Sequence, residues 1–207
     1  MRLYLTRHGE TEWNVAKKLQ GWENSPLTEN GLKRAHQFKE LVKDVEFDKI
    51  YTSDQKRAVD TANIIKNGRD IPIIELQELR ELSFGNWEGR TLADIKNKDA
   101  ELFDIFLNSP LLYKPSSGES ISDLFKRAKL ALSKIGNEDG ENILIVSHGV
   151  TIRAIITILK NLDIDGYKEI PVYPGASLSI FEKHETGWIS IIEGDISHFN
   201  DIVEEEL

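Results

Sequence analysis

One stretch of the sequence decides the fold: Ile143-Leu144-Ile145-Val146-Ser147-His148-Gly149. Its first four residues form an unbroken apolar run rich in β-branched side chains. Such a run is typical of a central parallel strand that is covered on both faces. After the strand, the apolar spacing predicts a helix through Leu162. A buried strand followed directly by a helix is the repeating unit of an α/β domain.

Further strands and helices alternate along the chain, as the apolar spacing indicates. Short strands are predicted at Leu3–Leu5, Lys49–Thr52 and Ile71–Leu76. Amphipathic helices are predicted over 30–43, over 58–65 and, after an N-cap at Ser120 with Asp123 in a capping box, over 121–135. Strands that alternate with helices in this way favour a parallel sheet.

The remaining segments complete the predicted architecture. Ser177–Phe181 and Trp188–Ile192 alternate around a glycine-containing turn, which predicts a hairpin at a sheet edge. Residues 86–120 carry few strand signals and are predicted to form a mostly helical insertion. We therefore expect a single domain over residues 1–207. Its predicted fold is a three-layer α/β/α arrangement with a mostly parallel central sheet and a helical lid insertion.

The composition limits the classes of function. The 207 residues include 26 Lys and Arg against 35 Asp and Glu, a net charge of −9, and 40% are hydrophobic. This hydrophobic content is enough for a folded core. The acidic balance argues against a nucleic-acid partner and against attachment to an anionic membrane. Because the chain has no cysteine, thiolate nucleophiles and cysteine-based metal sites are excluded.

The apolar segments also bear on location. The first residues hold only a short apolar run before Arg7, which is unlike a signal peptide. The longest apolar region, Ile143–Leu162, is interrupted by histidine, arginine and lysine, so it does not resemble a membrane span. We expect a cytoplasmic protein. The sequence does not predict an oligomeric state.

Two of the predicted strands end in a His-Gly pair, at His8-Gly9 and at His148-Gly149. In open α/β sheets, ligands bind beyond the carboxyl ends of the strands. Two imidazoles placed there are candidates for one site. Arg7, next to the first pair, offers a planar fork of donors that suits phosphate oxygens, and a histidine can act as nucleophile or base near neutral pH.

A series of short motifs extends from these pairs through the chain. They are Arg7-His8-Gly9-Glu10-Thr11 with Asn14; Gln20-Gly21, Ser25-Pro26-Leu27-Thr28 and Gly31; Ser53, Arg57-Ala58 and Thr61-Ala62; Leu79, Glu81, Phe84-Gly85 and Trp87-Glu88-Gly89; Gly118-Glu119-Ser120; and Ser147-His148-Gly149. In this order they resemble the histidine phosphatase superfamily, the phosphoglycerate mutase-like proteins. The resemblance covers nearly the whole chain.

The resemblance implies a set of roles at one site. His8 would attack phosphorus and form a phosphohistidine, while its other ring nitrogen is held by an acceptor such as a backbone carbonyl. Arg7 and Arg57 would clamp the phosphoryl oxygens, and His148 would donate to them from a third side. Glu81 would protonate the leaving alkoxide and then activate water.

Other residues are assigned more simply. Asn14, Gln20, Gly21 and Gly149 are expected to line the phosphate pocket. Glu78 and Glu88 lie close to Glu81 in the sequence and are alternative candidates for the acid. The position relative to Phe84-Gly85 in the motif favours Glu81. His36, His184 and His198 are interpreted as structural or solvated. The scheme needs no cofactor and no metal ion, and no Asp, Glu or His cluster has recognised metal-ligand spacing.

Residues 99–120 bear on the choice between phosphatase and mutase. Mutases that resemble this chain carry a stretch rich in arginine, lysine and tyrosine there, whereas here Lys114 is the single cation in an apolar segment. The Phe84–Gly89 segment is also similar to the phosphatase branch. We therefore predict a phosphomonoesterase for small phosphorylated metabolites, with a lid that favours an organic or partly apolar leaving group.

Several alternatives remain open at this stage. The motif spacing is similar to that of α-ribazole phosphatases and equally to that of broad-specificity phosphatases. A cofactor-dependent phosphoglycerate mutase is less favoured. A fructose-bisphosphatase is the least favoured of these, because the sequence offers few extra cations for a second phosphate group. A catalytically inactive protein that binds a phosphorylated ligand is disfavoured, since His8, Glu81 and the other expected catalytic side chains are all present.

Overall fold

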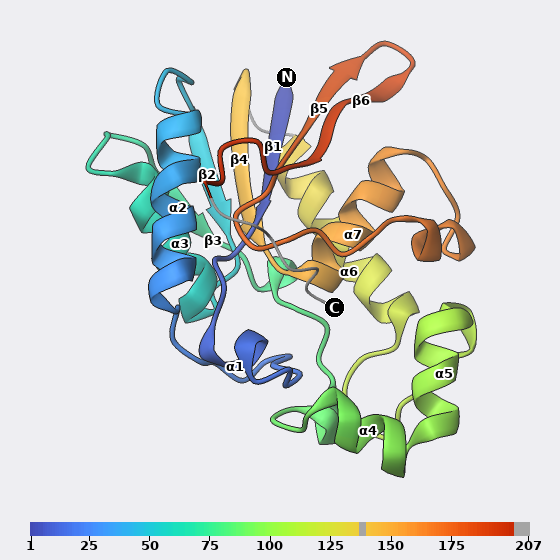
Figure 1. Cartoon of the computed structure of the whole chain (residues 1–207). Helices are drawn as coiled ribbons and strands as arrows, with labels where there is room; N and C mark the ends of the chain where they lie inside the picture. The colour runs from blue at the N-terminus through green and yellow to red at the C-terminus, as the bar shows by residue number, and fades with distance from the viewer. Residues whose placement is uncertain (137–139, 201–207) are drawn as a thin grey trace.

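One six-stranded sheet runs through the part of the chain that the computed structural model describes, residues 1–136 and 140–200 (Figure 1). In spatial order its strands are β3 (Ile73–Glu75), β2 (Lys49–Thr52), β4 (Asn142–Ser147), β1 (Arg2–Arg7), β5 (Leu178–His184) and β6 (Gly187–Asp195). The first four are parallel, and β5 and β6 form an antiparallel hairpin beside β1. The predicted mostly parallel sheet with an edge hairpin is confirmed.

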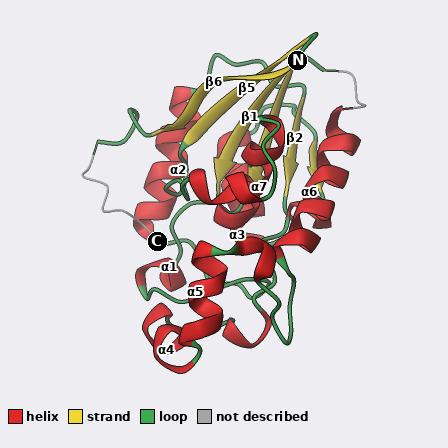
Figure 2. Ribbon diagram, turned by 90° about the vertical axis from the view of Figure 1, so that its right-hand side faces the viewer, coloured by secondary structure: helices red, strands yellow, loops and turns green. Residues whose placement is uncertain are grey.

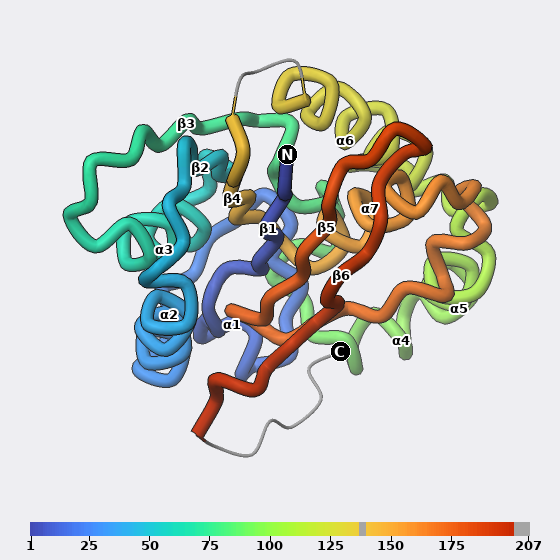
Figure 3. The backbone as a smooth tube through the Cα atoms, turned by 90° about the horizontal axis from the view of Figure 1, so that it is seen from above, coloured from blue at the N-terminus to red at the C-terminus, as the bar shows by residue number. Residues whose placement is uncertain are grey.

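Helices cover both faces of this sheet (Figure 3). On one face lie α2 (Glu29–Leu41) and α3 (Lys56–Lys66), and on the other lie α6 (Ile121–Gly136) and α7 (Gly149–Leu159). The shorter elements are α1 (Glu12–Val15), α4 (Leu92–Lys98), α5 (Ala100–Asn108) and the 3₁₀ turns η1 (Gln77–Leu79), η2 (Gly85–Trp87), η3 (Pro110–Leu112) and η4 (Asp165–Glu169). The three-layer α/β/α architecture is therefore as predicted.

The residues of β4 show why both faces are covered. Ile143 and Ile145 belong to the hydrophobic cluster formed with α6 and α7, whereas Leu144 and Val146 belong to the cluster formed with α2 and α3. All four side chains are fully buried. Successive side chains of a strand point to opposite faces, so an unbroken apolar run is what a strand between two helical layers requires.

Most element boundaries differ from the prediction by a few residues, and two of these differences have a clear local cause. Helix α7 ends at Leu159 instead of Leu162, because the chain turns through Asn161, whose φ is +53°. Strand β3 begins at Ile73 instead of Ile71, because the Ile71 N–H donates to Arg69 O in a turn. No helix in the described residues is long and apolar enough to cross a membrane.

The predicted insertion is helical, as expected, and contains η2, α4, α5 and η3. It lies beyond the carboxyl ends of the parallel strands, at the same end of the molecule as α1 (Figures 1 and 2). Its aromatic rings pack on one another, with centroids 6.0 Å apart for Trp87 and Phe103 and 5.0 Å apart for Phe106 and Tyr113. These rings belong to the hydrophobic cluster that also contains α6 and α7, so the core of the insertion is continuous with the core of the domain.

Candidate active site

The two predicted histidines meet because β1 and β4 are neighbouring parallel strands. Arg7 is paired with Ser147 in their register, and the His8 N–H donates to Ser147 O at 2.9 Å. The two strands therefore end side by side. The ring centroids of His8 and His148 lie 5.1 Å apart. Two histidines far apart in the sequence thus form one site at the carboxyl edge of the sheet, as predicted.

The ring of His8 is oriented by its own loop. Its Nδ1 lies 2.7 Å from Gly9 O, and because a carbonyl oxygen only accepts, Nδ1 carries the proton. The Gly9 N–H in turn donates to Thr61 Oγ1 at 3.0 Å, which holds the loop against α3. The expected backbone acceptor is confirmed. The other nitrogen, Nε2, is left with its lone pair and accepts from Arg57 Nε at 3.2 Å.

Burial keeps this imidazole neutral. It lowers the pKa of His8 well below 6.5, and the positive charges of Arg57 and Arg7 lower that pKa further. A neutral ring keeps the Nε2 lone pair available at neutral pH. The site therefore presents an uncharged imidazole close to two cations.

His148 is completely buried beside it. Burial lowers the pKa of His148 well below 6.5, and Arg57, among other cationic neighbours, lowers it further. Neither ring nitrogen has a hydrogen-bond partner among the described residues. Buried polar groups are almost always paired in native proteins, and an unpaired donor is costly. A ligand oxygen at this point would satisfy the N–H of His148.

Arg57 is held almost entirely by carbonyl oxygens. Its Nη1 donates to Glu23 O at 2.7 Å and its Nη2 donates to Gly21 O at 2.9 Å. Burial lowers the pKa of Arg57 to about 10, while the nearby Glu81 carboxylate opposes that shift. The guanidinium is still charged at neutral pH, and its Nε–H points at Nε2 of His8.

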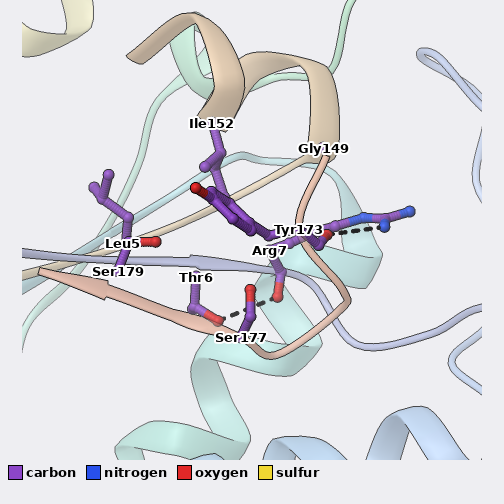
Figure 4. Close-up of a pocket in the computed structure, with 8 residues that line it drawn as sticks. All are labelled: Leu5, Thr6, Arg7, Gly149, Ile152, Tyr173, Ser177 and Ser179. Carbon is purple, nitrogen blue, oxygen red and sulfur yellow. Dashed lines mark hydrogen bonds between the residues drawn. The ribbon is translucent and has the colours of Figure 1, made fainter. Parts of the chain in front are cut away.

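Arg7 approaches the same site from the end of β1. Its Nη1 donates to Tyr173 O at 3.2 Å, and its side chain passes close to Gly149 in a narrow cleft (Figure 4). A Cβ at residue 149 would lie 2.9 Å from Val172 Cγ1 and 3.5 Å from Arg7 Nε. The glycine after His148 therefore leaves room for Val172, whereas Arg7 would be at ordinary van der Waals distance from such a Cβ.

The carboxylate of Glu81 lies at the amino terminus of α7, the helix that follows His148. Its Oε2 accepts from Val150 N–H at 3.2 Å, and its Oε1 accepts from Thr151 N–H and Thr151 Oγ1, both at 3.2 Å. The positive end of a helix dipole stabilises an anion at this position. Only 8% of the residue is exposed, and its charge acts on Arg57.

The two competing acids lie elsewhere. Glu78 forms an ion pair with Lys134 at the surface. Glu88 uses its Oε1 to accept the backbone N–H groups of Trp22 and Phe84, which holds two loops together. Of these three acids, Glu81 is the one whose carboxylate contacts the helix behind His148. Among the described residues, no group of three or more His, Asp or Glu side chains could hold a metal ion.

The family model that matches this chain describes the histidine phosphatase superfamily, branch 1, and the match covers residues 3–192. The chain belongs to the histidine phosphatase superfamily. It is 35% identical to the adenosylcobalamin/alpha-ribazole phosphatase of Salmonella typhimurium, over 94% of this chain and 92% of that protein. It is 31% identical to a Proteus mirabilis protein named "Probable phosphoglycerate mutase GpmB", over 100% of this chain and 99% of that one.

A solved structure agrees with the fold. Bacillus stearothermophilus YhfR superimposes with a TM-score of 0.90 at 41% identity, covering 95% of this chain and 98% of that one. The predicted membership of the superfamily is confirmed, and its members that resemble this chain include phosphatases of small phosphorylated metabolites and proteins named as probable phosphoglycerate mutases.

The side chains predicted to line the phosphate pocket of this histidine phosphatase are bound within the loops. Asn14 Oδ1 accepts from Thr11 N–H at 3.0 Å in the capping box of α1. Gln20 donates to Thr11 Oγ1 at 2.7 Å and accepts from Ser25 Oγ at 3.1 Å. Gly21 offers its carbonyl to Arg57. The phosphate-binding roles of Asn14, Gln20 and Gly21 stay predictions.

Sequence reasoning missed three residues that surround the acid. Thr151 binds the Glu81 carboxylate, and Arg127 donates to Glu81 O at 3.2 Å while it pairs with Glu119. Gln55 accepts the Glu81 backbone N–H at 3.0 Å. Gln55 lies between Ser53 and Arg57, and Thr151 follows the Ser147-His148-Gly149 motif, whereas Arg127 lies within α6, outside the motifs. None of the three has a side chain whose chemistry alone would single it out.

Proposed function

We propose that this chain is a phosphatase that hydrolyses small phosphate monoesters through a phosphohistidine on His8. The observation that carries the proposal is the orientation of His8. Its Nδ1 proton is held by Gly9 O, its Nε2 lone pair faces Arg57 Nε, and burial keeps the ring neutral. This is the arrangement that a nitrogen nucleophile requires.

In the first step, the Nε2 lone pair forms a P–N bond while the P–O bond to the leaving group breaks. The charge on the phosphoryl oxygens would be balanced by Arg7 and Arg57, and the unpaired N–H of His148 would donate to one of these oxygens. The protonated carboxyl of Glu81 would supply the proton that the leaving alkoxide needs.

In the second step, water attacks the phosphorus of the phosphohistidine. Its proton passes to the Glu81 carboxylate, and the electrons of the P–N bond return to His8 Nε2. Inorganic phosphate leaves, and the protonated Glu81 and neutral His8 are restored. We propose that the reaction uses no cofactor and no metal ion, so turnover of p-nitrophenyl phosphate should persist in excess EDTA. Complete loss of turnover would contradict this.

The insertion supports a phosphatase over a mutase through its shortage of cations. Lys114 is the single lysine or arginine of residues 99–120, and it is exposed. A second phosphate group on the substrate would find little positive charge there. The similarity to a protein named as a mutase keeps mutase activity as the second candidate.

The apolar residues of the insertion give less support for an apolar leaving group than the sequence suggests. Tyr113 is buried and packs with Phe106 and Trp87 in the core of the insertion. Leu111 and Leu112 are exposed. An organic leaving group stays our proposal, with both an α-ribazole phosphate and a broad range of monoesters as substrates to test.

The test supplies 3-phosphoglycerate together with 2,3-bisphosphoglycerate and follows the products by phosphorus NMR. We expect release of inorganic phosphate with little interconversion of phosphoglycerates. Efficient interconversion with little phosphate release would overturn the choice of a phosphatase. A parallel panel of phosphorylated metabolites that includes α-ribazole phosphate separates the two substrate ranges by their kcat/KM values.

A further inference from the structure

Gln55 lies between Arg57, the arginine that faces His8, and the backbone of Glu81, the proposed acid. It follows β2 and is the N-cap residue of α3, yet its side chain makes no capping bond. Ser, Thr, Asp and Asn are the preferred residues at such a position. The side chain of Gln55 is instead buried, with 4% of the residue exposed, and is directed at other groups.

The amide of Gln55 makes three hydrogen bonds within the described residues. Its Nε2 donates to Gly21 O at 2.8 Å. Its Oε1 accepts from the Glu81 N–H at 3.0 Å and from Arg57 Nη2 at 3.3 Å. A single side chain thus contacts the loop of residue 21, the arginine that faces His8, and the backbone of the proposed acid.

These contacts form a closed arrangement. Arg57 Nη2 donates to both Gly21 O and Gln55 Oε1, and Gln55 Nε2 donates to the same Gly21 O. Because each member is held by the other two, a displacement of the amide would move the guanidinium. The bond from the Glu81 N–H ties the acid segment to the same oxygen.

We propose that Gln55 is a positioning residue that sets the guanidinium of Arg57 and the backbone of Glu81 relative to one another. The inference rests on the proposed function, in which Arg57 stabilises the phosphoryl group and Glu81 protonates the leaving group. Misplacement of a catalytic group by about 1 Å can cost about 100-fold in rate. One amide would therefore influence both the stabilisation of the phosphoryl group and the protonation of the leaving group in the transition state.

The position requires an amide that both donates and accepts. An ionised glutamate would keep the two accepting bonds but lose the donor to Gly21 O, and it would add a negative charge beside that carbonyl. A methionine of similar size would lose all three bonds and leave the Glu81 N–H without its partner. The substitutions Gln55→Glu and Gln55→Met therefore separate donation to Gly21 O, which both remove, from acceptance of the Glu81 N–H, which only Gln55→Met removes.

The test compares kcat/KM for p-nitrophenyl phosphate with kcat/KM for an alkyl phosphate. The nitrophenolate leaves without a proton, so kcat/KM for p-nitrophenyl phosphate depends on the stabilisation of the phosphoryl group by Arg57 but not on proton donation by Glu81. The kcat/KM for the alkyl phosphate depends on both. For Gln55→Met we expect a loss of about 10-fold on the first substrate and about 100-fold on the second. Gln55→Glu should lower both values by a similar factor, because it keeps the bond to Glu81.

A double-mutant cycle with Glu81→Gln gives the decisive readout. In the Glu81→Gln background, the extra loss that Gln55→Met causes on the alkyl phosphate should disappear. If that extra loss persists in full, or if Gln55→Met lowers both substrates equally, the positioning role is wrong. If Glu81→Gln itself shows no dependence on the leaving group, the proposed function fails instead.

A matched control lies at the other end of the same strand. Asp48 precedes β2 and accepts from the N–H groups of Glu141 and Asn142 at 2.8 and 2.9 Å, far from the site. Asp48→Asn should lower the free energy of unfolding without changing the ratio of the two kcat/KM values. A changed ratio in this control would show that general destabilisation is enough to produce the effect, and would overturn the inference for Gln55.

Discussion

The carboxyl edge of the sheet and the helical insertion beside it are stabilised by different forces. At the edge, buried polar groups are fixed by directional hydrogen bonds, as between His8 and Gly9 O or between Arg57 and Gly21 O. In the insertion, aromatic rings around Trp87 pack on one another, and the Trp87 Nε1–H donates to Asp99 Oδ2 at 3.2 Å. Apolar packing tolerates substitutions of similar volume better than a buried polar network tolerates the loss of a partner. We infer that the reaction is set by the edge and the choice of leaving group by the insertion.

The largest effect should come from removing the nucleophile at the edge. His8→Ala should abolish turnover and the acid-labile phosphoenzyme, because no P–N bond can form at this position. The matched change in the insertion is Leu112→Ala, at a residue that is 65% exposed. It should leave kcat/KM for p-nitrophenyl phosphate unchanged. Substantial turnover by His8→Ala would show that the reaction does not depend on a nucleophile at residue 8.

Removing the acid should have the next largest effect. Glu81→Gln should slow formation of the phosphoenzyme from alkyl phosphates by about 10²–10⁴-fold. Nitrophenyl phosphate should be affected less in kcat/KM, because its leaving group needs no proton. The measurement is kcat/KM on both substrates. Equal losses on the two would reject Glu81 as general acid.

The buried imidazoles should make stability depend on pH. The pKa values of His8 and His148 in the folded protein lie well below 6.5, so below about pH 6.5 the unfolded chain binds protons that the folded chain does not. The free energy of unfolding should therefore fall as the pH is lowered. His148→Gln should reduce this slope by up to about 1.4 kcal/mol per pH unit.

Urea unfolding at several pH values between about 7 and 5 measures that slope. The unsubstituted chain, measured in parallel, is the reference for the slope. An unaltered slope in His148→Gln would contradict the buried, neutral state of this ring.

The smallest effect is expected in the core of the insertion. The Tyr113 hydroxyl is buried and has no hydrogen-bond partner among the described residues, and burial raises the pKa of Tyr113. Tyr113→Phe should therefore leave the free energy of unfolding unchanged or raise it by up to about 1 kcal/mol. Thermal unfolding and kcat/KM for p-nitrophenyl phosphate are the measurements. A large loss of stability or of kcat/KM would show that the insertion depends on a hydrogen bond from the Tyr113 hydroxyl.

The sequence predicts the sheet and the meeting of its histidines well, for a physical reason. An unbroken run such as Ile143–Val146 is typical of a strand covered on both faces, and parallel neighbours end at the same edge. A carbonyl acceptor for His8 follows from the chemistry of imidazole, whereas its identity as Gly9 O comes from the structure. These features depend on local pattern and general rules of topology.

Other features depend on where loops distant in sequence meet, which a pattern does not contain. Gln55 reads as an ordinary polar residue before a helix, yet it contacts residues 21 and 81. The apolar residues of 99–120 suggest a pocket wall, although Phe103, Phe106 and Tyr113 pack within the insertion. The boundary of α7 was missed because Asn161 adopts a left-handed conformation that its neighbours do not signal.

The central claim is that His8 becomes phosphorylated, and mass spectrometry of the trapped phosphoenzyme tests it most directly. The enzyme is mixed with p-nitrophenyl phosphate and quenched in alkali, where a phosphohistidine survives and an acyl phosphate does not. We predict one phosphoryl group on the peptide that contains His8, absent in His8→Ala and lost on acidification. A phosphoryl group on His148, or an intermediate that is stable in acid, would contradict the account.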